Sequence, residues 1–172
     1  MPAVEEVASR LSQAKTFTLV DAKDCLWQKR LDTEPSYKAT FNTSFGRFRW
    51  NRMRFSIFSA PKVWQRIMLE FEGRLEGMEV IADDFLIVGS GNSDREVNNS
   101  LERHERAFLE KCRLWNLKLN RDKVKRHQSS VKFLGHLLTS KGLRAGLEKI
   151  QAILQMAELK EVVQSLCLIY QK

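Results

Sequence analysis

The chain has 172 residues, of which 43% are hydrophobic and 29% charged, and its formal net charge is +8. This composition is that of an ordinary globular domain with a sizeable core, which excludes fibrous and disordered classes. The basic excess favours a polyanionic partner such as nucleic acid, although a surface charged only for solubility explains it equally well.

Cysteine usage and the apolar runs bear on the cellular compartment. The three cysteines are far apart and odd in number, so they form neither a disulfide framework nor a zinc motif. The first residues have no apolar core of a signal peptide, and runs such as residues 85–88 are too short to cross a bilayer. We therefore expect a cytoplasmic or nuclear protein with no membrane partner.

The first half of the chain is predicted to hold two helices and three strands. Helical spacing of apolar residues predicts a helix over residues 3–14, and the run TFTLVD predicts a strand that ends at Asp21. Residues 31–55 are rich in threonine and aromatic residues, which is typical of two strands joined by a turn. A helix is then predicted from the segment SAPKVWQRIM to Gly73.

The second half of the chain is predicted to contain further strands and two helices that pack on them. Two strands are expected in MEVIADDFLIVGSG, and Ser93 with Glu96 forms a capping box that opens a long helix. The predicted buried stripe of that helix is Val97, Leu101, His104, Phe108, Cys112 and Trp115. A strand LKLN, a basic segment RDKVKRHQSS, a strand pair VKFLGHLLTSKGL and a helix from about Leu147 follow. This order predicts an α+β fold.

Asp83 and Asp84 stand between two apolar runs, VIA and FLIV. An Asp-Asp pair alone is usually a solvated turn, but a turn between apolar strands ordinarily uses Gly, Asn or Pro. Two adjacent carboxylates among apolar residues repel each other and lose hydration, so they need a compensating cation. Mg²⁺ meets this need, because it is a hard ion held by a few carboxylates together with substrate phosphates.

Asp21 ends the apolar run FTLV, where an ionised side chain is unexpected. It either caps a helix or turn, or meets Asp83 and Asp84, since neighbouring strands lie about 4.8 Å apart. Three carboxylates gathered in this way can hold two metal ions about 3.5–4 Å apart, which suits in-line phosphoryl transfer. The residues alone leave polymerases, nucleases and phosphatases open.

Basic residues gather in two further segments. Arg47, Arg49 and Arg52 alternate with aromatic residues in RFRWNRMRF, so this strand either has a solvated basic face or neutralises phosphates. The segment RDKVKR is either a solvated loop or a contact for a nucleic-acid backbone. We expect Trp64 to be a packing residue and His104 to be a core histidine rather than a ligand.

Six segments carry a resemblance: FTLVDAKDCLWQKRLD, ATFNTSFGRFRWNRMRF, SAPKVWQRIM, EVIADDFLIVG, LKLNRDKVK and VKFLGHLLTSKGL. In order and interval they resemble the reverse transcriptase of Gypsy-like long-terminal-repeat retrotransposons and retroviruses. The resemblance implies a right-hand polymerase palm, an antiparallel sheet with helices packed on one face, with part of the fingers and the start of the thumb. Residues 1–160 would form the reverse transcriptase domain, with a fingers insertion at about 28–55, and residues 161–172 the start of the thumb or a frayed tail.

The resemblance implies roles for the acidic residues. The positions that match the family's metal site are Asp21, Ala22, Asp83 and Asp84. Two Mg²⁺ ions, or alternatively Mn²⁺, would be bound there. Lys123 matches the lysine that protonates the leaving pyrophosphate, so the implied catalytic residues are the three aspartates and this lysine.

The resemblance also implies positions that bind substrates. Those for the incoming deoxynucleoside triphosphate (dNTP) are Asp24, Cys25, Leu26, Phe55 and Ser56. Those of the primer grip are Phe133, Leu134, Gly135 and His136. Those for the template are Arg47, Arg49 and Arg52. Leu26 replaces the family's usual aromatic sugar gate, and Ser56 replaces a glycine, whose backbone freedom serine lacks.

Two main hypotheses follow. The first is an RNA-directed DNA polymerase domain that joins a dNTP to a primer 3′-hydroxyl on an RNA or DNA template. It would work with the remaining Pol domains, namely the fingers N-terminus, thumb and ribonuclease H, and dimerisation stays open. The alternative is a degenerate or co-opted fragment that binds nucleic acid without catalysis, which a primer-extension assay distinguishes.

Overall fold

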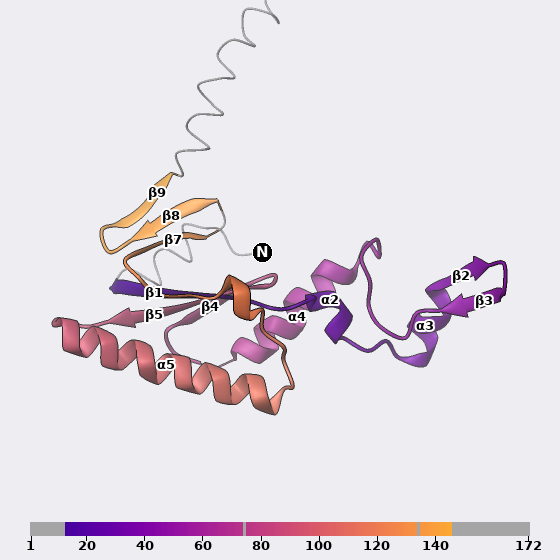
Figure 1. Cartoon of the computed structure of the whole chain (residues 1–172), viewed down its shortest axis with the longest axis horizontal. Coiled ribbons are helices and arrows are strands. Elements are labelled where there is room, and N and C mark those ends of the chain that lie inside the picture. The colour runs from indigo at the N-terminus through magenta and orange to yellow at the C-terminus, as the bar shows by residue number, and fades with distance from the viewer. Residues whose placement is uncertain (1–12, 74, 134, 146–172) are drawn as a thin grey trace, which may run out of the picture.

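A four-stranded antiparallel sheet forms the centre of the computed structural model, which describes residues 13–73, 75–133 and 135–145 (Figure 1). The strand order is β4-β5-β1-β6. The strands are β1 (Ala14–Asp21), β4 (Met78–Ile81), β5 (Asp84–Ser90) and β6 (Lys125–Gln128). The central strand β5 is a short, nearly continuous apolar run, DFLIVGS, which is typical of a strand that is buried on both faces.

Helices cover one face of this sheet. They are α4 (Ala60–Glu72) and α5 (Asp94–Leu114). The centre of the core on this side is an aromatic cluster of Phe71, Phe85 and Phe108, each at most 1% exposed, with ring centroids 5.1–6.0 Å apart. Burying each ring stabilises the fold by about 1.5–3 kcal/mol, so this cluster fixes both helices on the sheet.

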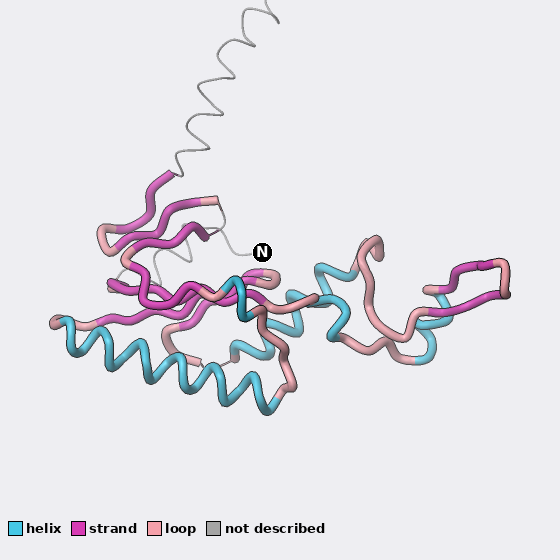
Figure 2. The backbone as a smooth tube through the Cα atoms, viewed as in Figure 1, coloured by secondary structure: helices cyan, strands magenta, loops and turns pink. Residues whose placement is uncertain are grey.

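A second, three-stranded sheet covers the opposite face (Figure 2). Its strands are β7 (Ser130–Phe133), β8 (His136–Thr139) and β9 (Gly142–Ala145). Val131, Phe133 and Leu138 pack there against Phe17 and Leu86 of the central sheet. Both faces of the central sheet are therefore buried, and its functional groups have to lie at its ends or edges.

The segment between β1 and α4 projects from this body as an arm, defined here as residues 32–50 (Figure 1). Before it comes α2 (Cys25–Gln28), and within it lie α3 (Thr33–Lys38), β2 (Thr40–Thr43) and β3 (Gly46–Arg49). No residue of the arm belongs to either core cluster of the described residues. Instead, Trp50 packs on Phe41 and Trp27, with ring centroids 4.9 and 5.2 Å apart.

The expected α+β fold is confirmed, and so is the capping box of α5. Ser93 Oγ accepts a hydrogen bond from the Glu96 amide, and Glu96 Oε2 accepts from the Ser93 amide. His104 Nδ1 lies 2.7 Å from the Val88 carbonyl oxygen, but its side chain is only half-buried, and Glu105 is buried on α5 instead. In the described part of the chain, no helix has both the length and the apolar character needed to cross a membrane.

Several element predictions were wrong. Ala14 begins β1 instead of ending a helix, and residues 33–38 form α3, which breaks the predicted strand pair. Residues 117–120 make only an isolated bridge between Leu119 and Ala22. Trp115 is 44% exposed, because it follows the last turn of α5. The predicted strand pair after residue 130 is three strands, and the predicted helices over residues 3–12 and from Leu147 lie outside the described residues.

Candidate active site

Asp83 and Asp84 lie in the turn between β4 and β5. Ile81 pairs with Asp84 across the hairpin, so the loop consists of Ala82 and Asp83 alone. β1 ends beside this turn: Asp21 is the register partner of Asp84, and the Ala22 amide donates to the Asp83 carbonyl oxygen at 2.8 Å. The structure thus brings the three predicted aspartates to one end of the central sheet, although their chemical roles stay predictions.

Charge repulsion is concentrated at this end of the sheet. Burial raises the pKa of Asp84 above its ordinary value, and the negative charges of Asp83 and Asp21 raise it further, while Lys123 opposes the shift. Lys123 ends the short helix η1 (Arg121–Lys123), and its Nζ lies 3.0 Å from Asp21 Oδ2. This hydrogen bond raises the pKa of Lys123, so the lysine is held as a cation against Asp21.

The donor chemistry of the three aspartates fits a hard divalent cation, because their mutual repulsion favours a bound positive charge. Among the residues that the structure describes, no three carboxylate, thiol or imidazole groups already form a metal-binding cluster. Asp21 is instead paired with Lys123. Metal binding would therefore require Asp21 to exchange this ion pair for coordination.

A cavity of about 700 Å³ opens beside Asp83. Three of the residues predicted to bind nucleotide line it, namely Cys25, Leu26 and Phe55. Burial raises the pKa of the Cys25 thiol, and the nearby Asp83 carboxylate raises it further. The cavity therefore has an apolar wall and one acidic edge.

The other two residues predicted to bind nucleotide have a left-handed backbone. Asp24 has φ 49° and precedes α2, and Ser56 has φ 74° beside Phe55. Glycine adopts such a conformation without steric cost, whereas other residues require support from their surroundings. The sequence difference at Ser56 therefore falls where a glycine would be the less strained residue.

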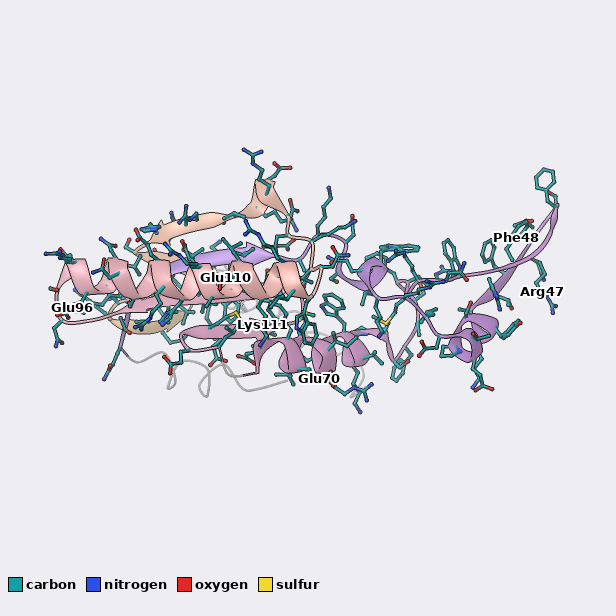
Figure 3. All side chains as sticks on the ribbon, turned by 90° about the horizontal axis from the view of Figure 1, so that it is seen from below. Arg47, Phe48, Glu70, Glu96, Glu110 and Lys111 are labelled. Carbon is teal, nitrogen blue, oxygen red and sulfur yellow. The ribbon has the colours of Figure 1, made fainter. Side chains whose placement is uncertain are left out.

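The predicted template arginines lie away from the aspartates. Arg47 and Arg49 are on β3, and Figure 3 shows Arg47 and Phe48 at the far end of the arm. Arg49 stacks on Tyr37, with its Cζ 4.4 Å from the ring centroid. Arg52 donates to the carbonyl oxygens of Trp27 and Gln28 at 3.0 and 3.3 Å, so it braces the base of the arm.

Phe133 and His136, two of the predicted primer-grip residues, lie on the second sheet, and no described residue of the predicted grip lines the cavity. Phe133 is 2% exposed and packs into the core, where it pairs with His136 across the β7–β8 hairpin. Gly135 has φ 72° in the turn between them, a conformation that favours glycine. Leu134 lies outside the described residues, and the primer grip stays a prediction.

Six residues of α4 that the sequence did not assign to the site also line the cavity, namely Pro61, Lys62, Trp64, Gln65, Arg66 and Leu69. Trp64, expected only to pack, and Gln65 reach the Ala82–Asp83 turn, while Lys62 and Arg66 add positive charge to the wall. One signal in the sequence could have indicated this role of Gln65. The glutamine stands on the same helix as two core residues, directly after Trp64 and three positions before Met68. A polar side chain in that position needs a partner, and the turn provides one.

Comparison with known proteins identifies the family to which the chain belongs. Residues 2–138 match the family model described as reverse transcriptase (RNA-dependent DNA polymerase). The chain is 30% identical, over 89% of its length, to the "Retrovirus-related Pol polyprotein from transposon 412" of Drosophila melanogaster. It is 27% identical, over 93% of its length, to the "Transposon Tf2-3 polyprotein" of Schizosaccharomyces pombe. The chain spans 12% of the length of each of these relatives.

Solved structures give the same fold. A foamy viral protease-reverse transcriptase in complex with double-stranded DNA matches 88% of this chain and 26% of its own, with a TM-score of 0.72 and 18% identity. A second foamy viral structure, in complex with an RNA/DNA hybrid, matches 91% of this chain and 22% of its own, with a TM-score of 0.68 and 17% identity. The likeness confirms the polymerase palm. The chain belongs to the reverse transcriptase (RNA-dependent DNA polymerase) family, as its resemblance to retrotransposon and retroviral Pol polyproteins predicted.

Proposed function

We propose that the chain is the catalytic palm of an RNA-directed DNA polymerase that transfers a nucleotide from a dNTP to a primer 3′-hydroxyl. The observation that carries this proposal is the meeting of Asp21, Asp83 and Asp84 at one end of the central sheet. In the reaction the primer 3′-hydroxyl loses its proton to water and its oxygen forms a bond to the α-phosphorus. The bond from that phosphorus to the oxygen bridging to the β-phosphate breaks, and pyrophosphate leaves.

The three aspartates, together with the backbone at Ala22, are the residues that would hold two Mg²⁺ or Mn²⁺ ions. When bound, the ions lower the pKa of the primer hydroxyl and neutralise the charge that develops on the leaving phosphate. Asp21 would give up its ion pair with Lys123 in favour of coordination. This exchange would leave Lys123 Nζ protonated and available to donate a proton to the pyrophosphate.

The substrate would occupy the cavity beside Asp83. Its apolar wall of Cys25, Leu26 and Phe55 fits the sugar and base of a dNTP, and the aspartate end fits the metal-bound phosphates. Because Leu26 is smaller than an aromatic residue, we expect weaker exclusion of ribonucleotides at the sugar position. The template strand would follow Arg47 and Arg49 of the arm, whose charges neutralise phosphates.

The domain would act within a longer polyprotein, since the curated relatives that it matches are about eight times its length. Thumb and ribonuclease H domains would then complete the grip on the template-primer. Reverse transcription of this kind would take place in the cytoplasm or nucleus.

Primer extension on purified protein, as the chain alone and within its parent polyprotein, tests the proposal with Mg²⁺ and with Mn²⁺. We expect extension by the polyprotein, and a fall of about 10²–10³-fold or more in Asp83→Asn, because one ligand of a preorganised charge-stabilising site is lost. Asp94→Asn, at the exposed start of α5, is the matched control and should retain the wild-type rate.

Other results would select other functions. Salt-dependent binding of RNA or DNA without dNTP incorporation, by chain and polyprotein alike, would identify a binding fragment that lacks catalysis. Metal-dependent cleavage of labelled nucleic acid would identify a nuclease. Extension that persists in Asp83→Asn would contradict the assignment of the aspartates.

A further inference from the structure

The Ala82–Asp83 turn has a backbone conformation that the turn residues alone do not favour. Ala82 has φ 55°, in the left-handed region, where a residue with a side chain is strained. A two-residue hairpin loop needs such a φ, which is why glycine and asparagine are the usual residues there. Something outside the turn therefore has to hold Ala82 in place.

Two consecutive side chains of α4 bind both polar backbone groups of Ala82. The Trp64 indole Nε1–H donates to the Ala82 carbonyl oxygen at 2.9 Å. Gln65 Oε1 accepts from the Ala82 amide at 2.7 Å, and Gln65 Nε2 donates to the Val80 carbonyl oxygen at 3.3 Å. We call Trp64 and Gln65 the α4 clamp.

The clamp is rigid at its helix end. Trp64 is 3% exposed and belongs to the core cluster on the helical face of the sheet, together with Phe71 and Met68. On the other side of the turn, the Ala22 amide holds the Asp83 carbonyl oxygen. Helix α4 therefore holds one residue of the two-residue loop, Ala82, and the end of β1 holds the other, Asp83.

We propose that Trp64 and Gln65 are positioning residues that set the place of the Asp83 carboxylate relative to Asp21 and Asp84. This inference rests on the proposed polymerase function and adds to it a role for α4 outside the acidic residues. The clamp lines the cavity beside Asp83, and its hydrogen bonds go to the backbone of residues 80 and 82. It acts through the backbone of Ala82, so its loss misplaces a carboxylate without removing one.

Hydrogen exchange on the full chain tests the clamp without any need for activity. Gln65→Met keeps the length of the side chain but loses both hydrogen bonds. We expect the Ala82 amide to exchange at least tenfold faster in this variant. Gln128→Met is the matched control, because Gln128 Nε2 donates to the Arg126 carbonyl oxygen on β6 and has no contact with the turn.

Metal affinity and kinetics of the polyprotein test the positioning role. We expect Gln65→Met and Trp64→Phe to lower kcat by about 10–100-fold, since small misplacements of catalytic groups have effects of this size. KM for dNTP should change less than threefold, and the Mn²⁺ concentration for half-maximal binding, measured by electron paramagnetic resonance, should rise several-fold. Trp64→Phe keeps the buried ring, so its near-ultraviolet circular dichroism should show a folded protein.

The outcomes separate this inference from the proposed function. An Ala82 amide that exchanges equally fast in wild type and Gln65→Met overturns the clamp. A folded Gln65→Met variant with wild-type kcat and Mn²⁺ affinity overturns the positioning role. A wild-type polyprotein that neither extends a primer nor binds Mn²⁺ overturns the proposed function and, with it, the positioning role. Even then, faster exchange of the Ala82 amide in Gln65→Met would support the hydrogen bonds of the clamp.

Discussion

Two tryptophans of the chain differ in what their indole N–H groups do. The Trp64 N–H donates to Ala82, whereas the Trp50 N–H is buried without a hydrogen-bond partner among the described residues. A buried donor without a partner contributes nothing and keeps its desolvation cost, of about 1–3 kcal/mol. The same chemical group therefore stabilises the protein at one position and opposes folding at the other.

Replacing each tryptophan by phenylalanine measures this difference. We expect Trp64→Phe to lower the free energy of unfolding by about 1–3 kcal/mol, because the Ala82 carbonyl loses its partner as well. Trp50→Phe keeps a smaller ring against Phe41, and the loss of apolar ring surface is offset by removal of the unpaired N–H, so the free energy of unfolding in urea should change by less than about 1 kcal/mol. Equal losses in the two variants would contradict this account.

At the scale of elements, a buried polar network ties β1, α5 and β6 together. Glu105 of α5 is 7% exposed and accepts from the Thr18 hydroxyl at 2.7 Å and from the Arg126 guanidinium. Thr18 Oγ1 in turn accepts from the His127 amide. Because β6 follows η1, which carries Lys123, the network also anchors the segment that brings this lysine to Asp21.

Glu105→Gln should lower the free energy of unfolding at pH 7 by about 1–3 kcal/mol, since a charge-assisted bond to Arg126 is lost. Burial alone would raise the pKa of Glu105, but the hydrogen bonds from Arg126 and Thr18 outweigh it and lower the pKa below the usual 4.5. The unfolded state then binds more protons, so this stabilisation is present above pH 4.5 and is lost as the pH falls below it.

Urea unfolding of wild type and variant between pH 3 and pH 7 measures this dependence. The difference between wild type and Glu105→Gln should shrink as the pH is lowered below 4.5. Glu110→Gln, at an exposed position of the same helix, serves as the control and should follow the wild type at every pH. A constant difference across the range would show that the Glu105 charge has no part in stability.

Sequence reasoning succeeded where the pattern is local. The strand that ends at Asp21, the β4–β5 hairpin and the capping box of α5 each follow from a few neighbouring residues, and the structure has all three. Sequence reasoning failed where contacts between distant residues determine the local conformation. Helix α3 is held by a distant contact, in which Ser36 Oγ donates to the Trp50 carbonyl oxygen at 2.8 Å, and the threonine-rich and aromatic composition of the segment predicted a strand instead. The α4 clamp joins residues 17 positions apart, which no local pattern reveals.

At the scale of the whole molecule, the arm and the body are stabilised separately. The body has the two core clusters on either side of the central sheet. In the arm, Phe41 stacks on Trp50, which also contacts Trp27 of α2 at the base of the arm, and Ser36 Oγ donates to the Trp50 carbonyl oxygen at 2.8 Å. The surface of the arm is basic and aromatic, with Phe45 91% exposed at the tip, which is an arrangement suited to nucleic acid.

The salt dependence of binding tests whether the arm contacts phosphates. We expect the double variant Arg47→Ala with Arg49→Ala to lower the slope of log K against log salt concentration by about 0.7–0.9 per lost phosphate contact. Fluorescence anisotropy with a labelled template-primer at several salt concentrations measures it. Arg103→Ala with Arg106→Ala on α5 removes the same charge from the body and should leave the slope unchanged.

The arm has no residue in either hydrophobic core cluster of the described residues, and this has an evolutionary consequence. Because residues 32–50 share no core with the sheet, substitutions, insertions or changes of charge there leave the strand register of Asp21 and Asp84 as it is. Loops held outside a core tolerate such variation far better than the elements that they join. Under the proposed polymerase function, descendants of such a chain can therefore change the templates they prefer while the arrangement of Asp21, Asp83 and Asp84 stays the same.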